Sequence, residues 1–161
     1  MRTFQIVQPF GALSVRENIA VGSHLHERAR HRALAQAEGI ARQVGMEAQL
    51  DLPAQGLTVA GRKRLELARA LATHPKLLLL DEVMAGLIPT EVSEIVGVIR
   101  KICNSGMTIL LIEHVMQAVM SLSDDVYVLN QGRIIAHGGP REIAANPQVI
   151  EAYLGRTAVH A

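Results

Sequence analysis

The chain has 161 residues, of which 49% are apolar and 19% charged, enough apolar material for a folded core and too much for a disordered tail. Its 16 basic and 15 acidic residues leave a net charge of +1, and aromatic residues make up only 2%, with no tryptophan. This composition argues against binding to a nucleic acid, because a protein that binds one needs a basic surface or aromatic side chains for stacking.

Cysteine use and hydropathy narrow the class of protein further. Cys103 is the only cysteine, which excludes an intramolecular disulfide and suits a reducing compartment. No stretch approaches the roughly 18 apolar residues of a membrane span.

The first zones along the chain differ in composition. Residues 1–22 mix apolar residues with turn formers, whereas residues 24–50 are rich in Ala, Arg, Glu, Gln and His. In the second zone apolar residues recur at helical spacing and predict an amphipathic helix. These residues are Ala33, Leu34, Ala37, Ile40, Ala41 and Val44.

From about residue 57, helix and strand alternate. A helix is predicted from about Arg62 to Leu71, and His74-Pro75 ends it. The basic run Arg62-Lys63-Arg64 predicts a solvated helix face. The run Leu77–Leu80 is apolar without alternation, which predicts a strand covered on both faces.

The next elements complete a βαβ unit. Pro89 opens a helix that ends near Gly106, and Thr108–Ile112 predicts a second buried strand. The helix has a core-facing stripe formed by Val92, Ile95, Val96, Ile99 and Ile102. Strand, helix and strand in this order predict a parallel sheet with a right-handed crossover, and therefore an α/β fold.

The rest of the chain, from residue 115 onward, is predicted to form smaller elements. They are a helix over 115–122, a hairpin of 126–129 with 133–136, and short helices around 141–145 and 148–154. Residues 156–161 are expected to be a frayed tail.

Polar residues follow both predicted parallel strands. Asp81-Glu82 comes after Leu80, and Glu113-His114 comes after Ile112. Because ligands gather at the carboxyl ends of parallel strands, Asp81, Glu82 and His114 are expected on one rim, where they suit metal-assisted hydrolysis. The alternative is that these residues only cap strands and begin loops.

The segment before the first strand of the βαβ unit gives a less specific indication of a binding site. Residues 57–64 begin a helix with small residues and a glycine, and the N–H groups at such a helix start can bind an anion. From this segment alone, an ordinary capped helix is the favoured interpretation.

Taken together, these segments resemble the ATPases of ABC transporters. The sequence LTVAGRKRLELARAL (57–71) resembles the signature motif with its helix, and LLLLDE (77–82) resembles the Walker B strand. Ala85-Gly86-Leu87 resembles the D-loop, LLIEH (110–114) the switch-histidine loop, and Gln5 in RTFQ the Q-loop glutamine. VRENIAVG, EVMAGL and NPQVIEAYLG extend the resemblance to the ATP-binding subunits of branched-chain amino acid importers.

The resemblance implies ATP and Mg²⁺ as cofactors and a role for each matching residue. Asp81 and Gln5 would hold Mg²⁺ through water, with Gln5 relaying to the membrane subunit. Glu82 would polarise the attacking water, and His114 would contact the γ-phosphate. The signature residues Thr58, Ala60 and Gly61 would face the nucleotide of a second ATP-binding subunit in a head-to-tail dimer.

The resemblance also implies an organisation and a location. It divides the chain into a Q-loop region (1–22), a helical subdomain beside the permease (23–56), the signature, Walker B, D-loop and switch-histidine core (57–139), and C-terminal helices with a tail (140–161). It places the protein in the cytoplasm, at the inner face of the plasma membrane, on membrane permease subunits.

The chain departs from the family pattern most clearly by an absence. No G-x-x-x-x-G-K-[ST] phosphate loop occurs in the sequence, so the fold is expected to be a partial P-loop NTPase. Where the family often has Ser-Gly-Gly-Gln, the chain has Thr58-Val59-Ala60-Gly61. We expect the chain alone neither to bind ATP usefully nor to hydrolyse it, and we expect exposed sheet faces to make it self-associate.

Parts of the sequence are compatible with two further functions. The chain could be a non-catalytic subunit that lends its signature helix to the ATP of a partner. Such a subunit has no use for Gln5, Asp81, Glu82 and His114, whose presence favours an ATPase. The other is a small metal-dependent hydrolase unrelated to ABC proteins, which the ordered set of motifs disfavours.

Overall fold

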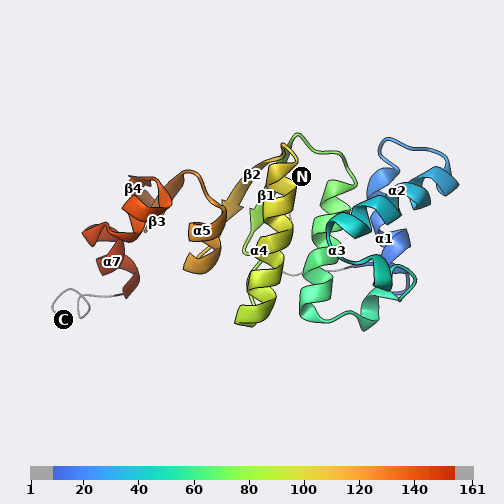
Figure 1. Cartoon of the computed structure of the whole chain (residues 1–161), viewed down its shortest axis with the longest axis horizontal. Helices are drawn as coiled ribbons and strands as arrows, with labels where there is room; N and C mark the ends of the chain where they lie inside the picture. Colours follow the sequence, from blue (N-terminus) through green and yellow to red (C-terminus); the bar gives the residue numbers. More distant parts are fainter. Residues whose placement is uncertain (1–8, 155–161) are drawn as a thin grey trace. The chain divides into compact units, whose positions relative to one another are not determined.

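The computed structural model describes residues 9–154 of the chain (Figure 1). The chain divides into two compact units, residues 1–114 and residues 115–161. Within residues 9–154, no helix combines the length and the apolar character that crossing a membrane requires.

The first unit begins with helices that pack on one another. They are α1 (Val15–Ser23), α2 (Arg30–Gln43) and α3 (Val59–Leu71), with the 3-10 turns η1 (Glu47–Gln49) and η2 (Ala54–Gly56) between α2 and α3. Helix α2 is the predicted amphipathic helix, and Ala33, Ala37, Ile40 and Ala41 of its apolar stripe are buried. Helix α1 lies where the sequence mixes apolar residues with turn formers.

Helix α1 begins at a capping box. The backbone N–H of Glu17 donates to Ser14 Oγ at 3.2 Å, and the backbone N–H of Ser14 donates back to Glu17 Oε2 at 3.0 Å. The fully buried Asn18 holds the preceding loop: its Oδ1 accepts from Phe10 N at 3.0 Å, and its Nδ2 donates to Ser14 O at 2.9 Å. These bonds fix residues 10–14 against α1.

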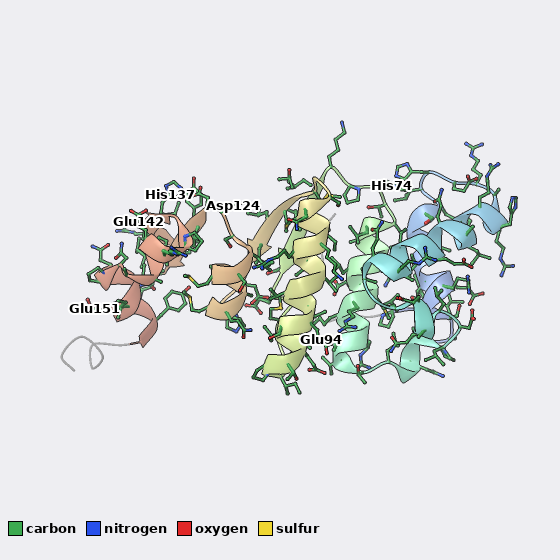
Figure 2. The ribbon with its side chains drawn as sticks, viewed as in Figure 1. His74, Glu94, Asp124, His137, Glu142 and Glu151 are labelled. Carbon is green, nitrogen blue, oxygen red and sulfur yellow. The ribbon has the colours of Figure 1, made fainter. Side chains whose placement is uncertain are left out.

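A βαβ unit follows, as the sequence predicts. Strand β1 (Leu77–Asp81) pairs in parallel with β2 (Thr108–Ile112), and helix α4 (Pro89–Asn104) connects them. All five predicted stripe residues of α4 are buried. Arg64 of α3 forms an ion pair with Glu94 of α4, which is labelled in Figure 2.

The prediction that both strands are covered on both faces is wrong for the described part of the chain. Leu78 and Leu80 are buried, but in β2 the side chains of Leu110 and Ile112 are each 56% exposed. Side chains alternate between the two faces of a strand, so the exposed residues share one face. Among residues 9–154, that face of the β1–β2 pair has no full cover.

The second unit is small. It contains α5 (Met116–Leu122), the antiparallel hairpin of β3 (Val126–Asn130) and β4 (Arg133–Gly138), and the helices α6 (Pro140–Ala144) and α7 (Pro147–Leu154). Its core is formed by Val128, Ile143 and Val149. On the hairpin, His137, labelled in Figure 2, bonds to Asp125 Oδ2 at 2.8 Å. The predicted hairpin and terminal helices are confirmed, while the predicted tail 156–161 lies outside the described residues.

Candidate functional site at the carboxyl ends of β1 and β2

The parallel pairing of β1 and β2 brings the predicted rim residues together. Asp81 lies opposite Ile112 in the register, and Glu82 continues the pairing by donating its N–H to Ile112 O at 2.9 Å. The Nδ1 atom of His114 lies 3.8 Å from Glu82 Oε1. Two side chains that are 32 residues apart in sequence are therefore neighbours, as expected from the end-to-end alignment of parallel strands.

The carboxylate and the imidazole are both accessible at this rim. The side chain of Glu82 is 32% exposed and that of His114 is 60% exposed. A carboxylate in this position can orient and polarise a water molecule, and an imidazole can donate a hydrogen bond to an anionic oxygen. The pair is suited to hydrolysis of a bond next to a negatively charged group.

The turn after β1 has an uncommon backbone. Glu82 has a φ of +48°, in the left-handed region that side chains other than glycine seldom adopt. Its carbonyl oxygen accepts from Ala85 N at 3.1 Å and from Lys63 Nζ at 3.3 Å. The next glycine, Gly86 of the predicted D-loop, has a φ of +78° and so occupies a conformation that glycine adopts at little cost.

Lys63 and Glu113 are functional candidates that the sequence reasoning missed. The predicted solvated face is wrong at Lys63, whose exposed fraction is only 6% because α3 directs it to the turn after β1. Glu113 Oε1 accepts the backbone N–H of Met84 at 2.8 Å. In the sequence, the only indication of a role for Glu113 was its position next to His114.

The predicted signature residues form the start of α3. Thr58 caps the helix by accepting the N–H of Gly61 at 3.1 Å on its Oγ1. Thr58 is exposed, whereas Ala60 and Gly61 are buried. The remaining predicted site residue, Gln5, lies outside the described residues.

The donor set at the rim meets part of the needs of Mg²⁺ and ATP. Asp81 and Glu82 supply the carboxylate oxygens that Mg²⁺ prefers, and Mg²⁺ usually keeps several waters and binds phosphate oxygens as well. Within residues 9–154, no group of three or more His, Cys, Asp or Glu side chains is placed to hold a metal ion by itself. The rim therefore fits the metal and water side of a Mg-ATP site, but these 161 residues contain no phosphate loop for the other side.

Family models match both halves of the chain. The model described as "ABC transporter" matches residues 2–85, and the model described as "Branched-chain amino acid ATP-binding cassette transporter" matches residues 133–159. The chain belongs to the ABC transporter family.

Relatives and solved structures agree with this assignment. The chain is 40% identical to the high-affinity branched-chain amino acid transport ATP-binding protein LivG of Salmonella typhimurium and 37% identical to BraF of Pseudomonas aeruginosa, in each case over 96% of this chain and 67% of the relative. The crystal structure of the ADP conformation of MJ1267, an ATP-binding cassette of an ABC transporter, matches 96% of this chain and 68% of its own with a TM-score of 0.82 at 28% identity. For cbiO1 of Clostridium perfringens, part of the transporter complex cbiONQ, the TM-score is 0.78 at 31% identity, over 94% of this chain and 60% of that one.

These matches confirm two sequence-based predictions. The fold is that of the ATP-binding cassettes, and the resemblance is to the branched-chain amino acid type. The chain spans about two thirds of the length of LivG and BraF.

Proposed function

We propose that the chain is the ATP-binding subunit of an ABC importer for branched-chain amino acids. The observation that carries the proposal is the approach of His114 to Glu82, at 3.8 Å, where two neighbouring parallel strands end. The names of LivG and BraF support the substrate class.

Each rim residue has a role in this proposal. Glu82 polarises a water molecule for attack, and His114 donates a hydrogen bond towards the outer phosphate oxygens. Asp81 holds Mg²⁺ through water, with Gln5 as a second water-mediated contact. Mg²⁺, when bound, neutralises charge on the phosphates.

The proposed partners follow from the family. Thr58, Ala60 and Gly61, at the start of α3, face the nucleotide of a second ATP-binding subunit in a head-to-tail dimer. The helical zone over 23–56 lies against permease subunits, at the inner face of the plasma membrane. The N–H groups that begin α3 suit an anion, because the positive end of a helix dipole favours negative charge.

We further propose that these 161 residues alone bind Mg-ATP poorly. A phosphate loop supplies about five charge-assisted hydrogen bonds, each contributing roughly 1.5–3 kcal/mol, so its absence costs ~7–15 kcal/mol. Micromolar binding corresponds to only about 8 kcal/mol. Equilibrium dialysis of the chain with Mg-ATP should therefore detect no low-micromolar binding, and a low-micromolar Kd would contradict the proposal.

The catalytic assignment needs a phosphate loop from another source. We expect Mg-dependent ATP hydrolysis when the chain is combined with a segment of a LivG relative that carries G-x-x-x-x-G-K-[ST]. Glu82→Gln should abolish that hydrolysis while leaving ATP binding in place, because the amide keeps the size of the side chain but not its charge. Equal hydrolysis by this variant would refute the assignment.

The second candidate function is a non-catalytic subunit that lends α3 to a partner. The exposed Thr58 at the start of α3 favours it, since that start does not depend on a phosphate loop in the same chain. The test is to mix the chain with complete LivG. Co-elution that requires ATP and survives Glu82→Gln would favour this alternative, provided that this chain contributes nothing to hydrolysis.

A further inference from the structure

Two charged side chains bind the backbone of the turn that follows β1. Lys63, from α3, donates from Nζ to Glu82 O at 3.3 Å. Glu113, directly after β2, accepts the N–H of Met84 on Oε1 at 2.8 Å. Neither residue has a role in the proposed reaction, yet both contact the turn Glu82–Ala85 that carries the proposed water-polarising carboxylate.

The backbone of Glu82 is held from both sides. Its N–H donates to Ile112 O at 2.9 Å, and its carbonyl oxygen accepts from Ala85 N as well as from Lys63. Its φ of +48° is unfavourable for a residue with a Cβ atom and persists only where surrounding contacts enforce it. The direction of the side chain depends on this conformation, in which Oε1 lies 3.8 Å from His114 Nδ1.

Burial makes both contacts costly to maintain. Lys63 is 6% exposed, and an ammonium group that leaves water needs acceptors in exchange. The second carboxylate oxygen of Glu113, Oε2, is buried and has no hydrogen-bond partner in the described part of the chain. An apolar residue at either position would avoid these costs, so their presence indicates a function other than packing.

We propose that Lys63 and Glu113 are positioning residues that hold Glu82 in its left-handed conformation and so set its carboxylate beside His114. The inference rests on the proposed function, which makes Glu82 the group that polarises water. Because Lys63 belongs to α3, it also links the helix that begins at Thr58 to the carboxylate of the same subunit.

Nuclear magnetic resonance of the full chain without nucleotide tests the two contacts separately. Glu113→Leu removes the acceptor of the Met84 N–H. The Met84 amide should therefore exchange with solvent at least about tenfold faster than in the unmodified chain, with the Ile99 amide in the core of α4 as the reference. Glu113→Gln retains a carbonyl oxygen and should keep the exchange rate within about twofold of the unmodified chain.

The Lys63 contact is tested by a signal from Glu82 itself. A left-handed residue gives a strong nuclear Overhauser effect between its own amide and α protons. Lys63→Met should weaken this signal at Glu82, while Arg62→Met, a change of the same type at the preceding residue, should leave it unchanged. Lys63→Arg retains a donor and should preserve the signal.

Unchanged Met84 exchange in Glu113→Leu, or an unchanged Glu82 signal in Lys63→Met, would overturn the inference. If Glu113→Leu fails to fold, the unmodified chain decides: a coupling through the hydrogen bond between the Met84 amide nitrogen and the Glu113 carboxylate carbon supports the role of Glu113, and its absence overturns it. If Lys63→Met fails to fold, the Glu82 signal of the unmodified chain decides, and a weak signal overturns the inference. These measurements contain no ATP. A failure of the chain to support hydrolysis would therefore count against the proposed function and leave this result unaffected.

Discussion

Gly22 is the position where a single added methyl group should harm the fold. It lies in α1, and a Cβ atom there would sit 2.6 Å from the backbone oxygen of Arg69 and 2.8 Å from the Cβ of Ala72. A backbone oxygen cannot rotate away, so α1 and α3 would have to separate. Gly22→Ala therefore combines an overpacking cost of about 3 kcal/mol, the upper end for core insertions, with a gain of about 1 kcal/mol in helix propensity. The net loss should be about 2 kcal/mol.

Two other helical glycines supply matched controls. Gly39 in α2 and Gly97 in α4 have nothing within 4 Å of the corresponding Cβ position. Gly39→Ala and Gly97→Ala should therefore stabilise the fold by roughly 0.5–1 kcal/mol each.

The free energy of unfolding, measured by urea titration and circular dichroism, should change in opposite directions for these variants. A Gly22→Ala protein at least as stable as Gly39→Ala would refute the close approach of α1 and α3. It would also remove the reason for a glycine at this crossing.

Three further predictions concern the loop before α1, its capping box and the uncovered sheet face. Asn18→Ala removes about three hydrogen bonds worth ~1 kcal/mol each and should lower the free energy of unfolding by ~3 kcal/mol; a loss in urea titration below ~1 kcal/mol would contradict the role of Asn18. Hydrogen bonds from Ser14 hold the pKa of Glu17 below its ordinary value of 4.5, so the stabilisation by Glu17 is complete above that pH and is lost as the pH falls through the lowered pKa. Glu17→Gln does not titrate and should give a flatter stability curve below pH 4.5, whereas parallel curves would exclude the contribution. Leu110→Lys and Ile112→Lys should reduce self-association of the chain in sedimentation velocity, because both residues lie on the uncovered face, and a monodisperse unmodified chain would refute the expected self-association.

The elements predicted best from the sequence are those whose signal is local. The five apolar stripe positions of α4 and the apolar runs of β1 and β2 specify a βαβ unit with few alternatives, and the structure has it. Helix α1 was missed because Gly22 and the polar residues dilute its apolar periodicity. The capping box of Ser14 with Glu17 was readable in the sequence and would have located its start.

The predictions that failed depend on contacts between distant segments. Lys63 lies between two arginines on a helix, and nothing in the local sequence distinguishes it from a solvated residue. Its burial follows from the approach of α3 to Glu82, 19 residues further along the chain. The exposure of Leu110 likewise depends on what covers the sheet, which the composition of a strand does not specify.

The placement of Glu82 beside His114 and the affinity for ATP depend on different parts of an ATP site. The mutual placement of Glu82 and His114 follows from the register of β1 with β2, and the left-handed turn at Glu82 is held by Ile112, Ala85 and Lys63. None of these contacts involves a phosphate loop, so residues of this chain alone set the placement of Glu82 beside His114. Affinity for ATP, in contrast, depends mainly on hydrogen bonds to the phosphates, which the loop would supply. Adding a segment that carries a phosphate loop should therefore raise ATP affinity greatly while leaving the Glu82 conformation unchanged.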